Sequence, residues 1–529
     1  MNIAFNIPDE LLNDRATKPF VLYRDHVRPL LESRRSGLNA MYAPVMGRPE
    51  LDPVFLIGVT LLQMMERMPD RQAIRACLFD LRWRLALGLP SDWKGFDPST
   101  LVYFRERLAK HGGSKRVLEA GLEAMRAAGY LRPRGAVRID STHVLAKLSH
   151  LSRLECVRET LRLALEFLVE FGGASAWEPW FTRYADRNPK ELRNASVERV
   201  RSSMDQAGLD AQDVLAQAQK LGDAVTQAES MTLLRRVFKD NFTVTEDGGV
   251  IQTEAQPSGA VHNPHDPEAQ WSTKRATGKA GWVGYKTQVC ETVPETRCAK
   301  GEPTSALITA IVTQPAITSD HGSLAPVTEA HLLNGQDAPD IVHTDAGYIS
   351  GPELARAEKE GFELCGPAPA PPHSGDRFGT DSFLVNLQAR TAVCPAGITS
   401  CACSKITESK DGRTYFYFAW AEVNCTACPL RNLCLSKKKK QARRSIQVGE
   451  FHEYSQARRN LCKTPEYQKR MQKRSAIEGT NSELKRGYGL GRSRYRGLKK
   501  TDLQMQFTAA ACNIHRWANR LCWLSRKAA

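Results

Sequence analysis

Two features of membrane and secreted proteins are missing from this sequence. Its longest nearly apolar run, Pro53–Met65, is shorter than the roughly 20 residues that a membrane-spanning helix needs. The opening segment MNIAFNIPDELLNDR contains acidic residues where a secretory leader would have an apolar stretch. We therefore expect a cytoplasmic protein that has no membrane partner.

Disulfide bonds are also not expected, although the chain has 14 cysteines. Thiols in the cytoplasm stay reduced, so a cysteine there is either a free thiol or a metal ligand. We accordingly interpret the cysteines by their spacing, as candidate metal ligands.

Acidic residues are in the minority, because 58 Asp and Glu stand against 74 Lys and Arg, a formal net charge of +16. Nucleic acid is the leading candidate for a polyanionic partner, since clustered Lys and Arg release counterions from phosphate backbones. Hydrophobic content of 42% and charged content of 25% are typical of a globular protein. A chain of 529 residues exceeds one ordinary core, so we expect two to four domains.

A basic segment, residues 473–498 (KRSAIEGTNSELKRGYGLGRSRYRGL), contains Glu478 among many cations. Arg474 precedes Glu478 by four residues and Lys485 follows it by seven, so a continuous helix would place all three on one face. The cations that follow are Arg486, Arg492, Arg494 and Arg496. Glu478 is either a partner in a surface ion pair or a metal ligand aimed at a phosphodiester whose phosphates the cations bind.

Two other acids follow predicted strands. In GAVRIDSTHV, apolar and polar residues alternate over residues 137–139 and predict a short strand that ends at Asp140. In PDIVHTDAGYISG, a buried strand leads to Asp345, and Gly347 allows a sharp turn into a helix. Asp320, in TSDHG, is the alternative to Asp345, but no strand leads directly to it. Acids at rigid strand ends suit metal binding, although many such residues only form turns.

The spacing Arg474-x3-Glu478-x6-Lys485 resembles the third-acid signature of bacterial insertion-sequence DDE transposases, which reads Tyr-x2-Arg-x3-Glu-x6-Lys. Met471 stands at the Tyr position, and Tyr467 lies one helical turn earlier and could substitute for it. The resemblance covers nearly the whole chain and is closest to the eleven-eighty-two group of these transposases.

The resemblance implies an α/β fold: a ribonuclease-H-like catalytic core with a helical N-terminal domain, a helical insertion and a cysteine-bearing β-rich insertion. The expected boundaries are 1–130 for the N-terminal domain, 131–366 for the first part of the core (helical insertion about 148–238), 367–460 for the cysteine-bearing insertion, and 461–529 for the C-terminal core helices. The segments VGYKTQVCETV and ALITAIVT are predicted as strands antiparallel to the strand of Asp140, and FELCGP as a fifth strand.

The N-terminal residues 1–130 have the signals of helices. In LDPVFLIGV and in FDPSTLVYF, an Asp followed by Pro is typical of a helix N-terminus. The resemblance implies DNA-end recognition or dimerisation for this region, and a purely structural helical cap is the alternative.

The resemblance also implies two-metal phosphoryl transfer, with Asp140, Asp345 and Glu478 as catalytic ligands of Mg²⁺ or Mn²⁺. Water would free a 3′-hydroxyl at the element end, and that hydroxyl would attack target DNA. The partners would be double-stranded DNA, namely terminal inverted repeats and target, bound by a homodimer at the nucleoid. Two alternatives stay open: a ribonuclease-H-like nuclease without strand transfer, and a non-enzymatic zinc-containing DNA-binding protein.

The insertion expected at 367–460 contains a group of cysteines. Cys425-x2-Cys428-x5-Cys434 has a spacing suited to structural zinc, which prefers four ligands. The fourth ligand would be Cys394, with Cys401 and Cys403 as its competitors. A set of reduced, partly buried thiols is the alternative.

Two further segments of this insertion are candidates for DNA contact. Trp420, in RTYFYFAW, either stacks on an unpaired base, as a Trp of this insertion does in the related transposases, or packs in the core. The run KKKKQARR, residues 437–444, is either a phosphate-binding segment or a solvated loop.

Overall fold

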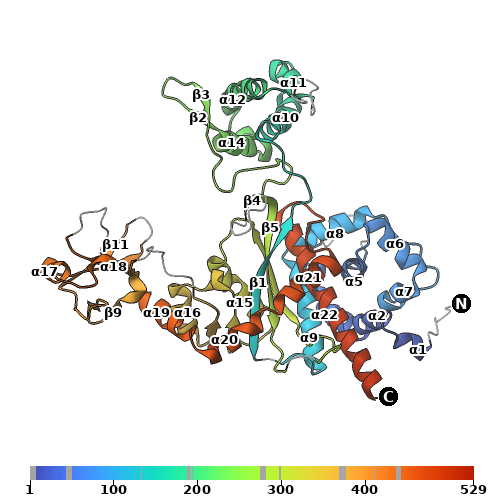
Figure 1. The fold of residues 1–529 in the computed structure, drawn as a ribbon. Coiled ribbons are helices and arrows are strands. Elements are labelled where there is room, and N and C mark those ends of the chain that lie inside the picture. The colour runs from blue at the N-terminus through green and yellow to red at the C-terminus, as the bar shows by residue number, and fades with distance from the viewer. Residues whose placement is uncertain are drawn as a thin grey trace.

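The computed structural model describes residues 8–42, 51–132, 134–186, 192, 195–273, 281–296, 299–368, 377–409, 412–435 and 442–528. A central sheet lies beside the N-terminal helices and the C-terminal helix, with a helical bundle above it and a small β-rich part to the left (Figure 1). None of the described helices combines the length and the apolar character needed to cross a bilayer.

The N-terminal part is helical, as predicted. Helix α5 (Pro53–Glu66) begins after Asp52, whose carboxylate accepts a hydrogen bond from Val54 N at 3.0 Å. At the start of helix α8 (Ser99–Lys110), Asp97 accepts a hydrogen bond from Ser99 N at 2.8 Å, although the N-cap residue is Pro98. The other helices of this part are α1 (Asp9–Leu12), α2 (Lys18–Leu22), α3 (Arg28–Ser33), α4 (Arg35–Asn39), α6 (Asp70–Phe79), α7 (Leu81–Leu87) and α9 (Arg116–Ala127).

Six strands form the central sheet, in the order β4-β5-β1-β7-β8 with β6 paired to β5. Their bounds are β1 (Ala136–Leu145), β4 (Gln270–Ser272), β5 (Trp282–Thr292), β6 (Ile308–Pro315), β7 (Ile341–His343) and β8 (Glu363–Cys365). Strand β5 is antiparallel to β1, whereas β7 is parallel to β1 and β8 is parallel to β7. The prediction for ALITAIVT was wrong in direction, because β6 pairs antiparallel with β5 and therefore runs the same way as β1. The mixed sheet is consistent with the ribonuclease-H-like fold.

Strand β1 is longer than predicted. It continues past Asp140 to Leu145, and Asp140 pairs with Val289 in its middle. The segment Asp-Ser-Thr has the composition of a turn, but the long strand β5 offers it a partner as far as Gly284. A Cβ at Gly284 would lie only 2.0 Å from Val144 O, so glycine allows the two backbones to approach there.

The helical insertion has a hydrophobic core of its own. Its helices are α10 (Arg153–Gly172), α11 (Glu178–Tyr184), α12 (Val197–Gln219), α13 (Asp223–Thr226) and α14 (Glu229–Asn241). A hairpin of β2 (Phe242–Val244) and β3 (Val250–Gln252) follows. The chain returns close to where it left, because Leu151 N donates to His262 O at 3.0 Å.

The cysteine-bearing insertion also has a separate small core, which includes Phe383, Phe418 and Trp420. Its strands are β9 (Leu384–Asn386), β10 (Thr391–Val393), β11 (Ala402–Thr407), β12 (Thr414–Ala419) and β13 (Ser445–Gly449), and its helices are α17 (Glu422–Thr426) and α18 (Arg431–Cys434). Strand β12 is the aromatic-rich segment expected from the sequence.

The largest core joins the two ends of the chain. Helix α22 (Leu498–Ala528) packs against β6, α5 and α9, and its residues share one apolar cluster with the N-terminal helices and one face of the sheet. Helices α15 (Leu324–Leu333) and α16 (Gly351–Glu360) supply residues to the cluster on the other face. The remaining helices are α19 (His452–Leu461), α20 (Pro465–Met471) and α21 (Ile477–Tyr488).

Candidate active site

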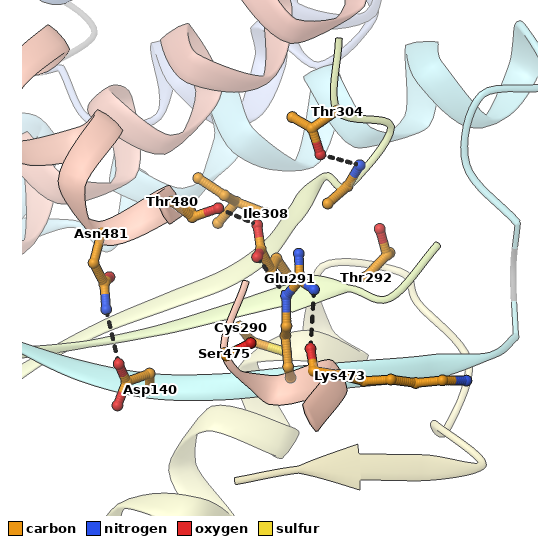
Figure 2. A network of polar contacts seen from close by, with 12 residues as sticks. Asp140, Cys290, Glu291, Thr292, Thr304, Ile308, Lys473, Ser475, Thr480 and Asn481 are labelled. Carbon is orange, nitrogen blue, oxygen red and sulfur yellow. Dashed lines mark hydrogen bonds and ion pairs between the residues drawn. The ribbon is translucent and has the colours of Figure 1, made fainter. Parts of the chain in front are cut away.

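Asp140 lies on β1 beneath helix α21. Its side chain is 15% exposed, and its Oδ2 accepts a hydrogen bond from Asn481 Nδ2 at 3.0 Å (Figure 2). Asn481 is on α21, three residues after Glu478. The contact therefore holds α21, the helix of Glu478, against β1, the strand of Asp140. The sequence pattern did not single out Asn481.

Asp345 is placed beside Asp140 by the parallel pairing of β1 with β7. Arg138 pairs with His343, and the two acids each lie two residues beyond this pair. Asp345 follows the end of β7, as predicted, and accepts a hydrogen bond from Gly347 N at 2.8 Å. This hydrogen bond fixes the carboxylate at the start of a short 3-10 helix, η6 (Ala346–Tyr348).

Asp320, the alternative to Asp345, belongs to the same acidic group. A Cβ at Gly347 would lie 3.0 Å from Asp345 Oδ1 and 3.1 Å from Asp320 Oδ2, so both carboxylates lie against this glycine. Lys286 Nζ forms an ion pair with Asp320 at 3.2 Å. The sequence posed a choice between two acids, and the structure brings both to Asp140.

Two neighbouring acids raise the proton affinity of Asp140. Burial raises the pKa of Asp140 to about 6; the Arg474 charge opposes this shift, and the charges of Asp345 and Asp320 add to it. Burial, with the charges of the same three aspartates, also raises the pKa of the Tyr348 hydroxyl well above its usual value. A bound cation would stabilise a group of carboxylates that repel one another.

Glu478 lies at the outer edge of this group. Its side chain is 68% exposed, and Arg474 lies between it and Asp140, at 3.3 Å from Glu478 and 3.7 Å from Asp140. The predicted continuous helix is interrupted, since Arg474 ends a 3-10 turn, η8 (Gln472–Arg474), and α21 begins at Ile477. Arg474 and Glu478 nevertheless meet on one face.

The carboxylate oxygens of this site suit a divalent cation such as Mg²⁺, because oxygen atoms are its preferred protein ligands. The raised pKa of Asp140 supports the same fit, since a bound cation would relieve the repulsion behind part of that shift. Over the described ranges, however, no three His, Cys, Asp or Glu side chains are already arranged as a metal site.

The predicted DNA-binding cations divide into two groups. Helix α21 ends at Tyr488, so the cations from Arg492 onward lie in a loop and not on the helical stripe that the sequence suggested. Arg494 is used internally, because it donates to Met68 O and Met64 Sδ of the N-terminal part. Lys485 and Arg494 are half-buried, whereas Arg486, Arg492 and Arg496 are exposed. Arg492 donates a hydrogen bond to Lys147 O at 3.2 Å.

Tyr467, the possible substitute for the missing signature tyrosine, has a structural role. It is buried, and its hydroxyl donates to Gly366 O at 3.1 Å and accepts from Gly366 N at 3.0 Å. These contacts hold α20 at the end of β8.

The four cysteines predicted as zinc ligands line one small pocket: Cys394, Cys425, Cys428 and Cys434. Burial raises the pKa of the Cys434 thiol; Arg444 lowers it, and the other three thiols raise it further. The competitors lie outside this pocket, and Cys401 is exposed. Cys394 therefore lines the same pocket as the other three thiols, but among the described residues these cysteines do not form a group arranged to hold a metal ion.

Two predicted DNA contacts in this insertion are not supported. Trp420 is 1% exposed, and its Nε1 donates to Ile398 O at 2.8 Å, so it packs in the core and is not available to stack on a base. Residues 437–441 of the basic run lie outside the described residues. Arg444 at its end donates to Cys434 O and Phe378 O, which is a structural role.

Two family models match parts of the chain. Residues 393–518 match the model described as Transposase DDE domain, and residues 13–107 match the model described as Transposase domain (DUF772). No curated protein matches the chain. The DDE domain indicates an enzyme that cleaves and transfers DNA, and the two matches together support a DNA transposase of the insertion-sequence type.

Proposed function

We propose that this protein is a transposase of the eleven-eighty-two group, which cleaves the ends of its insertion sequence and joins the freed 3′-hydroxyl to target DNA. The observation that supports the proposal is the parallel pairing of β1 with β7, because Asp140 and Asp345 each lie two residues beyond the paired residues Arg138 and His343. Helix α21, within the part that matches the DDE domain, adds Glu478 to their edge.

In this proposal, Asp140, Asp345 and Glu478 hold Mg²⁺ or Mn²⁺, and Asp320 adds charge beside them. The bound ions would activate the nucleophile and stabilise the leaving oxygen. Asn481 orients the Asp140 carboxylate through its hydrogen bond. Arg474, which neutralises Asp140 and Glu478 in the metal-free chain, is placed to bind a phosphate next to the scissile bond.

Double-stranded DNA is the proposed partner, bound along α21 and the loop that follows it, by two copies of the chain at the nucleoid. The exposed cations of this segment would contact phosphates and so bind DNA without reading its sequence. We further propose one structural zinc at Cys394, Cys425, Cys428 and Cys434, supported by the convergence of these four thiols on one pocket.

The decisive experiment uses the DNA that flanks the gene, which would contain the element's ends. Purified protein with Mg²⁺ should cleave this DNA and join the 3′ end to a second duplex. Asp345→Asn should bind DNA but not cleave it. Cleavage without joining would instead identify a nuclease, and metal-independent binding alone would identify a DNA-binding protein.

A further inference from the structure

Glu291 is a carboxylate with no exposed surface, located on β5 directly opposite Arg138 of β1. Its Oε1 accepts a hydrogen bond from Arg138 Nε at 2.6 Å. A buried carboxylate is costly unless it is paired and fully hydrogen-bonded. The question is therefore what the rest of this carboxylate binds.

Its second oxygen binds the two helices that cover the sheet. Glu291 Oε2 accepts from Thr480 Oγ1 of α21 at 2.7 Å (Figure 2). It also accepts from Arg516 Nη1 of α22 at 3.0 Å. Arg516 also donates to the Thr480 hydroxyl at 2.7 Å, and Arg138 donates to Lys473 O at 3.2 Å. One carboxylate thus connects two strands, two helices and the turn before α21.

These contacts lie next to the candidate catalytic residues. Arg138 precedes Asp140 by two residues on β1, so both side chains lie on the same face of the strand. Thr480 follows Glu478 by two residues on α21. Through the buried Glu291, the network therefore connects β1, which carries Asp140, to α21, which carries Glu478.

A contribution to stability does not by itself explain why a carboxylate such as Glu291 is buried here. Buried ion pairs of this kind can often be replaced by apolar residues of similar volume without loss of stability, so what they contribute has to be sought elsewhere. Here the network acts on geometry, because sliding or rotating α21 on β1 would break the Thr480 contact and remove one of the two hydrogen bonds that Glu291 Oε2 accepts in the core.

We propose that Glu291 is a positioning residue for the active site, which sets α21 on β1 so that Glu478 and Asp140 can hold the same metal ions. The inference rests on the proposed function, since it concerns the acids named there. Thr480 transmits this constraint to α21 through its hydroxyl.

The test compares Thr480→Val, which removes the hydroxyl at nearly constant volume, with Thr480→Ser, which keeps it. Glu291→Gln is a second disruptive variant. Asp210→Asn is the control, because Asp210 is also a buried carboxylate in a hydrogen-bonded ion pair (5% exposed, 2.6 Å from Arg183 Nη1) but lies in the helical insertion. The readouts are Mn²⁺ binding by the full chain on duplex DNA, followed by electron paramagnetic resonance, and the Mg²⁺ concentration for half-maximal cleavage.

We expect Thr480→Val to weaken Mn²⁺ binding and to raise the Mg²⁺ requirement by roughly tenfold, which is the lower range for residues that orient metal ligands. Thr480→Ser should restore both values, and Asp210→Asn should lower the melting temperature without changing either. If Thr480→Val melts earlier but keeps the wild-type metal dependence, the network is only structural and the inference is wrong. If instead wild-type Mn²⁺ binding does not depend on Asp345, the proposed function itself fails.

Discussion

At the residue scale, Asp140 should destabilise the metal-free fold. Burial raises its pKa from 3.8 to about 6, so the folded state binds this proton more tightly than the unfolded state. The carboxylate therefore costs stability increasingly as the pH rises from about 4 to about 6. We predict that Asp140→Asn is more stable than wild type above pH 6, by about 1–3 kcal/mol, and that the advantage disappears toward pH 4.

Thermal melts in EDTA between pH 4 and pH 8 measure this difference. Asp213→Asn serves as the control, because Asp213 is an exposed acid of α12 and its replacement should change little at any pH. If Asp140→Asn were less stable than wild type across the range, the contacts of Asp140 with Asn481 and Arg474 would outweigh its burial.

Asp320 should tune the site without being essential to it. Its charge raises the pKa of Asp140, but Lys286 already compensates it. We predict that Asp320→Asn cleaves DNA with a severalfold higher Mg²⁺ requirement, whereas Asp345→Asn does not cleave. A Mg²⁺ titration of the cleavage rate separates the two, and complete loss in Asp320→Asn would make Asp320 a metal ligand.

At the scale of elements, α21 and the loop after it contain two kinds of cation. Lys485 lies in the last turn of α21, and we predict that Lys485→Ala lowers DNA affinity for every sequence and reduces the salt dependence by about one unit of slope. Arg494 bonds to the N-terminal helices, so Arg494→Ala should lower the melting temperature and leave that slope unchanged. Titration of a fluorescent duplex at several salt concentrations measures both; equal slopes for wild type and Lys485→Ala would remove Lys485 from the interface.

Two variants of the cysteine-bearing insertion test the proposed zinc site. Metal analysis of the purified chain should find about one zinc, and Cys428→Ser should lose it together with the fold of the insertion. Cys401→Ser should keep the zinc, because Cys401 lies outside the pocket. A stable, active protein without zinc would mean that the four thiols are simply reduced side chains.

The elements that the sequence predicted well are those with strong local signals. The Asp-Pro pairs predicted the starts of α5 and α8. Asp52 caps α5 as expected, whereas Asp97 bonds to Ser99 N from one residue before the N-cap of α8, Pro98. Asp345 follows a strand, as its apolar run indicated. The end of β1 was missed because Ser141 and Thr142 have the composition of a turn, while their pairing depends on the distant strand β5.

The parts of the site that the sequence missed or left open depend on contacts between distant segments. Asn481 meets Asp140 only because α21 packs on β1, and no spacing in the sequence encodes that approach. Asp320 reaches the acids through a loop after β6. Trp420 is a residue type that can stack on a base, but it is buried because it packs in a small aromatic core.

At the scale of the whole molecule, some parts have a hydrophobic core of their own and others share one. The helical insertion has its own core and nearly adjacent ends, whereas α22 shares one core with the N-terminal helices and the sheet. We predict that replacing residues 153–260 by a short Gly-Ser linker leaves a soluble, folded protein. A chain that ends before Leu498 should be insoluble, because its apolar core would be exposed.

Size-exclusion chromatography and circular dichroism of the two deletions provide the measurement. If the chain without α22 were monomeric and cooperatively folded, the N-terminal helices would be sufficient without their C-terminal partner. An aggregated chain after removal of the insertion would show that the insertion supports the sheet.

The core shared by the two ends of the chain also has a consequence for synthesis. The N-terminal helices leave the ribosome long before α22, and at about 5–20 residues per second the delay is on the order of 20–80 s. During that time the apolar faces that α22 later covers have no partner, which makes the nascent chain a natural client for chaperones. A newly made molecule thus acquires its complete core only after α22 has left the ribosome.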